Sequence, residues 1–135
     1  MKKLDVTIIT PDLSGQDKHK FHSQAKMVTF RALTGEMGIL PRRVACSVIL
    51  GQGVMRVIDE EERKIAIMGG VLHFENDVLT VLTQEAHLPT EIDTTTVKLQ
   101  IQECESRLTQ ETSPGVLADI RKDLRRYRIL IDATN

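Results

Sequence analysis

The sequence predicts a β + α fold, in which an N-terminal antiparallel β-sandwich is followed by a C-terminal antiparallel two-helix hairpin. Before Pro89 the apolar residues come in short runs rich in Val, Ile and Thr, at the spacing of roughly 8–12 residues that is typical of sandwich strands. Seven of the eight glycines lie in this region. After Pro89 the apolar residues repeat with helical spacing instead. We therefore expect two domains, residues 1–90 and residues 91–135.

The first predicted strand covers residues 4–9, where apolar and polar side chains alternate with the period of a half-buried strand. Pro11 has no N–H to donate to a sheet, so this strand is expected to stop at residues 10–12. A polar loop is expected over residues 14–22, and a second strand over residues 25–32.

Five further apolar runs are expected to be separate strands. They are Val44–Leu50, Val54–Ile58, Ile65–Met68, Val71–Phe74 and Val78–Thr83. The residues between them are typical of turns, namely Gly51-Gln52-Gly53, the charged residues 59–64, Gly69-Gly70 and Asn76-Asp77. No helical pattern lies between these runs, which favours an antiparallel sandwich over a parallel α/β sheet.

Two amphipathic helices are expected after Pro89. The apolar face of the first consists of Val97, Ile101, Cys104 and Leu108, with Asp93 or Thr94 as its N-cap. The apolar face of the second consists of Leu117, Ile120, Leu124, Tyr127 and Ile131. Ser113 precedes Pro114, which is the order expected at the start of a helix.

The two predicted helices carry opposite net charge. Residues 91–111 contain five acids and two bases, a net charge of −3, whereas residues 114–131 contain five bases and two acids, a net charge of +3. Opposite charges and narrow apolar stripes favour an antiparallel pair. Each stripe has four or five side chains, worth about 1.5–3 kcal/mol apiece when buried, which barely offsets the ordering of the backbone. The hairpin is therefore expected to be a movable element.

Composition and motifs exclude several function classes. The net charge of −1 and the low aromatic content, one Tyr and three Phe with no Trp, argue against a nucleic-acid-binding protein. Cys46 and Cys104 make neither a disulfide framework nor a metal cluster. No phosphate-binding glycine loop and no nucleophile–base pair stands out, so we expect no enzyme activity and no cofactor. We expect neither a secretion signal nor a membrane-spanning segment.

The segment from Thr34 to Arg43 (TGEMGILPRR) is the most unusual part of the chain. Two glycines flank Glu-Met, and an apolar Ile-Leu pair is followed at once by Pro and two arginines. One interpretation is an ordered loop that presents Met37, Ile39 and Leu40 partly to solvent for binding. The other is a corner of the sandwich whose apolar residues fold inward.

Several of these segments resemble the epsilon subunit of F-type ATP synthases, of the bacterial or plastid type that corresponds to the mitochondrial delta subunit. They are Leu4–Asp12 (LDVTIITPD), Gly35–Pro41 (GEMGILP), Ile67–Val71 (IMGGV), Asn76–Thr83 (NDVLTVLT) and Glu91–Asp93. Their order and spacing match the family, and the resemblance covers about residues 4–131.

The resemblance implies a non-catalytic rotor subunit in the central stalk of the enzyme, coupling the catalytic head to the membrane ring of c-subunits. A sandwich of about ten strands would bind the gamma subunit and contact the c-ring. The hairpin would either fold down on the sandwich or extend toward the catalytic beta and alpha subunits and inhibit ATP hydrolysis. The protein would be peripheral to the membrane, on the cytoplasmic face of a bacterial inner membrane or the stromal face of a plastid thylakoid.

Two sets of residues take roles from the resemblance. The c-ring contact loop would be Glu36, Met37, Gly38, Ile39, Leu40, Pro41, Arg42 and Arg43. The basic face of the inhibitory helix, which would meet acidic segments of the beta subunits, would be Arg121, Lys122, Arg125, Arg126 and Arg128. Several such pairs together would give a salt-dependent brake.

The chain departs from the family at three places. Arg42-Arg43 replaces the usual Gly-His after the loop proline, and residues 13–22 form a longer segment than usual. Some bacterial members bind ATP through an Ile/Leu-Asp-x-x-Arg-Ala motif. Ile92, Asp93 and a later Arg128 match this nucleotide site, but Thr96 and Val97 replace Arg-Ala and Leu124 replaces a basic residue. The missing guanidinium would have gripped phosphate, so nucleotide binding is expected to be weak or absent.

A second hypothesis keeps the fold but not the complex. In it the sandwich is a stand-alone adaptor that binds a small ligand, and the hairpin caps it. Co-elution with a gamma-like coiled-coil subunit would distinguish the two hypotheses.

Overall fold

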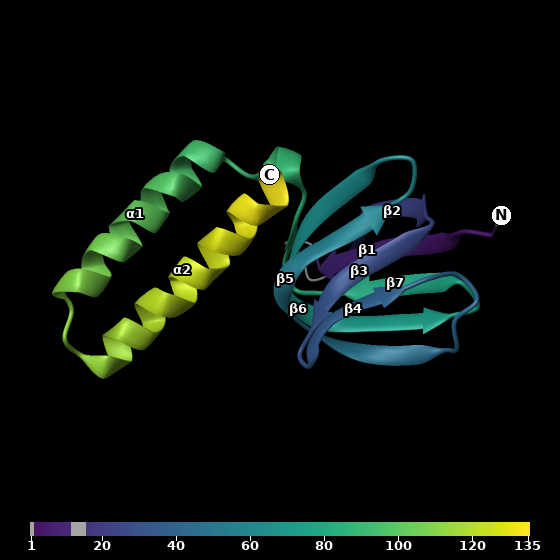
Figure 1. The fold of residues 1–135 in the computed structure, drawn as a ribbon, viewed down its shortest axis with the longest axis horizontal. Helices are drawn as coiled ribbons and strands as arrows, with labels where there is room; N and C mark the ends of the chain where they lie inside the picture. The colour runs from purple at the N-terminus through teal and green to yellow at the C-terminus, as the bar shows by residue number, and fades with distance from the viewer. Residues whose placement is uncertain (1, 12–15) are drawn as a thin grey trace.

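The computed structural model describes residues 2–11 and 16–135 (Figure 1). Within these residues it has eight strands, one short 3-10 helix and two α-helices. The strands are β1 (Leu4–Pro11), β2 (Asp17–Ala25), β3 (Met27–Ala32), β4 (Gly35–Ile39), β5 (Cys46–Ile58), β6 (Glu62–Glu75), β7 (Val78–Leu82) and β8 (Ala86–His87). The helices are η1 (Pro89–Glu91), α1 (Thr94–Gln110) and α2 (Pro114–Thr134).

The long strands β5 and β6 run through both layers of the β-sandwich. They pair antiparallel from Cys46↔Phe74 to Ile58↔Glu62. The first half of β5 and the second half of β6 form one layer with β7, β1 and β2, and the remaining halves form the other layer with β3, β4 and β8. Aliphatic residues and two phenylalanines, Phe30 and Phe74, fill the space between the layers.

Two predicted turns are wrong, because Gly51-Gln52-Gly53 and Gly69-Gly70 lie inside β5 and β6. The strands bend at these glycines and change which side faces the core, and this interrupts the alternation of apolar residues. Gly69 and Gly70 have φ of +91° and +130°, and a Cβ on Gly70 would lie 2.3 Å from the carbonyl oxygen of Leu82. Joining four predicted strands into two reduces the seven predicted from the residues to five. Strands β2, β4 and β8 bring the total in the described residues to eight, against the ten or so that the family resemblance implies.

The polar loop predicted for residues 14–22 is also wrong from residue 17 onward. Strand β2 begins at Asp17 and pairs antiparallel with β1, which itself continues through Pro11. Because β2 is an edge strand, it tolerates polar residues on the side that faces solvent. Residues 13–15 of the longer segment noted above lie outside the described residues. The predicted turn at Asn76-Asp77 is confirmed, since both residues have positive φ (51° and 62°).

The two helices form the predicted antiparallel hairpin. Asp93 is the N-cap of α1 and accepts the N–H of Thr96. At the turn, the carboxylate of Glu111 accepts the N–H groups of Thr112 and Ser113, each at 3.0 Å, which lowers the pKa of Glu111. Ser113 stands at the N-cap position of α2, but its side chain makes no capping hydrogen bond.

The hairpin meets the sandwich along the C-terminal half of α2, and the turn between the helices lies away from it (Figure 1). There Leu130 and Ala133 of α2 pack with Val97 of α1 and with Ala66 of β6. Further along, Cys104, Ile120 and Leu124 pack in a separate cluster between the helices, and burial raises the pKa of the Cys104 thiol. Five residues of the predicted apolar faces are only half-buried, namely Ile101 and Leu108 of α1 and Leu117, Tyr127 and Ile131 of α2. None of the described helices is long and apolar enough to cross a membrane.

Candidate protein interface

The segment Glu36–Arg43 is part strand and part loop. Strand β4 pairs with β3 and turns the side chain of Ile39 into the core, where it is 2% exposed. Met37 packs against the same core. Leu40, by contrast, is 51% exposed and Val44 is 87% exposed. Of the two interpretations, the inward-folding corner is correct for Ile39, whose expected partial exposure is wrong, whereas Met37 is partly buried and Leu40 is exposed to solvent.

The end of this segment is held in place by Asp77, in the turn between β6 and β7. The backbone N–H of Arg42, a residue with φ of 68°, donates to Asp77 Oδ1 at 2.6 Å. The ammonium of Lys2 lies 3.2 Å from the other carboxylate oxygen. The Arg42 hydrogen bond, followed by the Lys2 ion pair, lowers the pKa of Asp77. Arg42 and Arg43 are exposed on this fixed loop.

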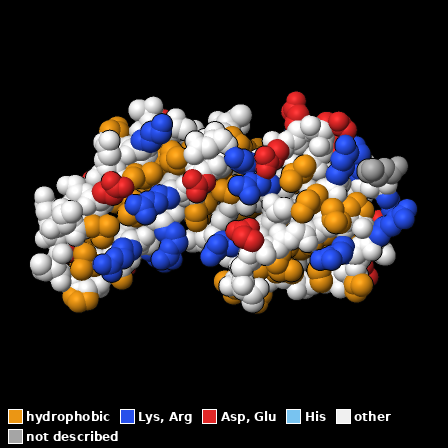
Figure 2. Space-filling view, in the orientation of Figure 1, with side chains coloured by type: hydrophobic (Ala, Val, Ile, Leu, Met, Phe, Trp, Pro, Cys, Tyr) orange, Lys and Arg blue, Asp and Glu red, His pale blue; other side chains and the backbone are white. Residues whose placement is uncertain are grey.

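The five predicted basic residues of α2 fall into two groups. Arg121, Lys122 and Arg125 are exposed, and none of them makes an ion pair with the described residues. The other two are paired: Arg128 lies 3.4 Å from Glu105 of α1, and Arg126 lies 2.6 Å from Glu85, just before β8. Figure 2 shows Lys and Arg side chains gathered along the hairpin beside hydrophobic side chains.

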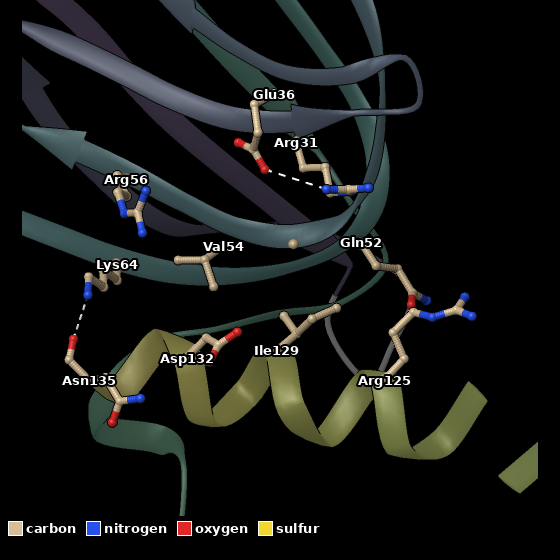
Figure 3. A pocket seen from close by; sticks show the side chains of 11 residues that line it. Arg31, Glu36, Gln52, Val54, Arg56, Lys64, Arg125, Ile129, Asp132 and Asn135 are labelled. Carbon is tan, nitrogen blue, oxygen red and sulfur yellow. Dashed lines mark hydrogen bonds and ion pairs between the residues drawn. The ribbon is translucent and has the colours of Figure 1, made fainter. Parts of the chain in front are cut away.

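A groove of about 590 Å³ lies between α2 and the outer face of the sheet (Figure 3). Val54 of β5 and Ile129 of α2 line its apolar part. Its charged residues have both signs and several are paired: Arg31 lies 3.7 Å from Glu36, and Lys64 donates to the backbone carbonyl of Asn135 at 2.6 Å. We interpret this groove as the seam where the hairpin meets the sandwich.

In the structure, the residues that match the nucleotide motif have other contacts. Asp93 caps α1, and its carboxylate accepts the hydroxyl of Thr96 at 2.8 Å, which lowers the pKa of Asp93. Ile92 packs in the apolar cluster at the base of the hairpin. Arg128 lies 3.4 Å from Glu105 of α1. Among residues 2–11 and 16–135, no group of three or more His, Cys, Asp or Glu could hold a metal ion.

The structure also contains an apolar surface that the sequence reasoning missed. Ile49, Val71, Leu82 and Ile9 are direct neighbours across β5, β6, β7 and β1. They point away from the core, and the first three are 63%, 45% and 50% exposed. We call these four residues the apolar row. Leu33, 70% exposed, extends it, since its N–H donates to the carbonyl of Ile49.

A polar row runs beside the apolar row on the same face. It consists of Ser47, His73, Thr80, Thr7 and His22, paired in that order across the strands. The hydroxyl of Ser47 lies 3.0 Å from Nδ1 of His73. An exposed apolar strip with a polar border is typical of a protein–protein interface.

One sequence signal could have revealed the apolar row. In each of its strands two apolar residues are adjacent, as in Ile8-Ile9, Ile49-Leu50, Val71-Leu72 and Val81-Leu82. Neighbouring residues of a strand point to opposite faces, so one of each pair must leave the core. Four such pairs in adjacent strands would predict an apolar outer face, provided that the strand pairing is known.

Comparisons with known proteins agree on one family. The model of the ATP synthase delta/epsilon chain β-sandwich domain matches residues 3–89. The ATP synthase epsilon chain of Brevibacillus brevis is 33% identical over 113 residues, covering 82% of each chain. That of Trichodesmium erythraeum is 34% identical over 134 residues, covering 96% of this chain and 94% of the other.

A chloroplastic relative and a solved structure extend the similarity over nearly the whole chain. The chloroplastic ATP synthase epsilon chain of Psilotum nudum is 26% identical over 133 residues, covering 98% of this chain and 96% of that one. A chain in the OSCP/F1/c-ring structure of the Euglena gracilis mitochondrial ATP synthase has the same fold, with a TM-score of 0.79 at 23% identity. That match covers 98% of this chain and 82% of the other.

Proposed function

The chain belongs to the ATP synthase delta/epsilon family as an epsilon-type, non-catalytic subunit, and from this premise we propose that its two parts have separate tasks. The sandwich, residues 1–90, attaches the subunit to the rotor of the enzyme by binding gamma and the c-ring. The hairpin, residues 91–135, inhibits ATP hydrolysis when it leaves the sandwich. The subunit is then peripheral to the membrane, held there through the complex on the cytoplasmic or stromal face.

The apolar row is the observation that carries the proposal for gamma. Three of its side chains are about half exposed, although the core beneath them is full. Exposing a strip of this kind is unfavourable unless a partner covers it, at about 25 cal/mol per Å² of apolar surface. An apolar stripe on gamma that runs across the strands would cover all four residues at once.

The gamma contact can be tested by placing a charge in the apolar row. Val71→Asp is expected to weaken co-purification of the subunit with gamma at least tenfold, because the carboxylate would be buried without a partner. The matched control is Thr80→Asp, which places the same charge on an adjacent strand in the polar row. Equal binding of gamma by both variants would contradict this assignment.

Leu40, Arg42 and Arg43 support the proposal for the c-ring. They lie on a loop fixed by Asp77, which also pairs with Lys2 near the N-terminus. In Figure 1 the N-terminus lies on the side of the sandwich away from the helices. Leu40, Arg42 and Arg43 therefore lie away from the hairpin, whereas Glu36, the first residue of the predicted loop, lines the groove beside α2. A c-ring contact made by Leu40 and the two arginines could be held while the helices move. The two arginines would make this contact more basic than is usual in the family.

The inhibitory role of the hairpin is supported by its narrow attachment and its exposed bases. A lever that meets the sandwich along the C-terminal half of α2 can be released without unfolding the core. Released, it would carry Arg121, Lys122, Arg125, Arg126 and Arg128 toward acidic segments of the beta and alpha subunits. Several cation–carboxylate pairs acting together would oppose rotation in a salt-dependent way.

Deleting residues 91–135 tests the brake in the assembled enzyme. We expect the truncated subunit to bind gamma normally and the enzyme to hydrolyse ATP faster, with the largest gain at low salt. The measurement is the steady-state rate of ATP hydrolysis over a range of nucleotide and salt concentrations. Equal rates with and without the hairpin under all conditions would remove the inhibitory role.

A further inference from the structure

We propose that Glu85 is a latch that holds the hairpin on the sandwich by pairing with Arg126, and that this pairing withholds one cation from the brake. The inference rests on the proposed function for its effect on hydrolysis. Its structural half, that the pair keeps the hairpin docked on the sandwich, concerns the isolated chain alone.

The contact between Glu85 and Arg126 is close, and one nitrogen of the arginine reaches both oxygens of the carboxylate. Nη1 of Arg126 lies 2.6 Å from one carboxylate oxygen of Glu85 and donates to the other at 2.9 Å. The two side chains are only about one-third exposed. Among the described residues, the pair of Glu85 and Arg126 is the ion pair that joins a side chain of the sandwich to a side chain of α2. Charge-assisted hydrogen bonds of this kind are stronger than neutral ones.

The backbone around Glu85 is held by hydrogen bonds within the sandwich that do not involve Arg126. The buried hydroxyl of Thr83 donates to the carbonyl of Gly69 at 2.6 Å and accepts the N–H of Glu85 at 3.3 Å. The carbonyl of Glu85 in turn accepts the N–H of Met68 at 3.1 Å. Nε2 of His87 lies 2.9 Å from the same carboxylate. Glu85 is thus presented by the rigid sandwich in one position.

Arg126 lies on the side of α2 that meets the sandwich. It precedes the buried residues Leu130 and Ala133 by four and seven positions, which places all three on one face of the helix. The docking face and the basic face of α2 therefore overlap at this residue. While Glu85 holds Arg126 against the sandwich, Arg126 cannot extend with the hairpin toward a carboxylate of another subunit, so the docked and inhibitory states compete for it.

The expected size of the effect follows from the exposure of the pair. Removing a partly exposed ion pair is expected to raise the undocked population of the hairpin about fivefold. The isolated full-length chain reports this population through hydrogen exchange of amides in residues 129–134, because the end of α2 loses its packing against residues 64–68 when the hairpin undocks and then opens more readily. Mass spectrometry of the corresponding peptides measures the exchange rates.

Four variants decide the structural half. Glu85→Gln and Arg126→Gln are each expected to speed exchange at the seam about fivefold, as estimated for a partly exposed pair. Glu61→Gln, the same change at an exposed site of the sandwich, is expected to leave it unchanged. The double variant Glu85→Arg with Arg126→Glu should restore slow exchange. Circular dichroism confirms that each variant is folded. Exchange in Glu85→Gln that equals the wild-type rate, or that Glu61→Gln reproduces, would overturn the latch.

Hydrolysis by the assembled enzyme decides the functional half. Glu85→Gln is expected to deepen inhibition, because Arg126 is released to the brake. Arg126→Gln also releases the hairpin but removes one of its five cations, so it is expected to deepen inhibition less than Glu85→Gln does. Faster or equal hydrolysis with Glu85→Gln would overturn the link between latch and brake. If deleting residues 91–135 leaves hydrolysis unchanged, the proposed inhibitory function fails, while the exchange result still stands for or against the latch.

Discussion

The sandwich and the hairpin are built on very different amounts of buried apolar surface. Among the residues that the structure describes, the sandwich core contains 18 buried residues in one cluster. The hairpin has two small clusters with three and four buried residues, one of which belongs to the sandwich. Because buried apolar area is the main source of stability, the sandwich can serve as a rigid platform. In the hairpin, the buried apolar surface barely offsets the chain entropy that is lost on folding, and such a marginal element can move.

The largest effect on stability is expected from a substitution in the sandwich core. Phe74 is fully buried, and Phe74→Ala is expected to lower the free energy of unfolding of the whole protein by about 3–5 kcal/mol. Urea denaturation followed by circular dichroism measures it. Leu99→Ala, at a 62% exposed site of α1, is the control and should change stability by less than about 0.5 kcal/mol.

A substitution in the hairpin should act locally instead. Ile120 is 2% exposed between the helices, and Ile120→Ala is expected to destabilise the hairpin by about 2–4 kcal/mol. Since the sandwich core is not touched, helical signal should be lost at lower urea than sheet signal. A single cooperative transition for helix and sheet would show that the two regions are not independent.

A smaller effect is expected at Asp77, and it depends on pH. Its folded-state pKa is lowered by the Arg42 hydrogen bond and the Lys2 ion pair, so the ionised form stabilises the fold. This stabilisation is present above the unfolded pKa of about 3.9 and is lost as the pH falls through the folded pKa. The stability difference between wild type and Asp77→Asn should therefore shrink below about pH 4. A difference that stays constant down to pH 2 would contradict this account.

The smallest expected effect is a gain in the stability of the hairpin. Gly115 lies in the first turn of α2, and a Cβ there would meet no atom within 4 Å. Gly115→Ala is expected to stabilise the hairpin by about 0.5–1 kcal/mol, because alanine loses less chain entropy in a helix. Thermal unfolding followed at 222 nm should show the gain in the helical signal, with the sheet transition unchanged.

The sequence predicts some parts of this molecule well for physical reasons. Helical periodicity is a local property, so both helices could be placed from spacing, and the N-cap of the first was narrowed to Asp93 or Thr94, of which the structure has Asp93. The turn at Asn76-Asp77 follows from residues that tolerate positive φ. The bends at Gly51–Gly53 and Gly69-Gly70 were mistaken for turns, because glycine permits both and only strand pairing distinguishes them.

The candidate interface was less predictable, because it depends on contacts between distant residues. The apolar row exists only once β1, β5, β6 and β7 are aligned. Ile39 and Leu40 are neighbours in sequence, yet one is buried and the other exposed. The basic residues of α2 were identified from sequence. That Arg126 pairs with Glu85, 41 positions away, required the folded chain.

The most direct test of a rigid platform with a loosely held lever is hydrogen exchange measured amide by amide at increasing denaturant. The account predicts that amides of α1 and α2 exchange through an opening of lower free energy than those in the centre of β5 and β6, so that the hairpin opens while the sandwich stays folded. Helix and strand amides that exchange through one common global unfolding would contradict it.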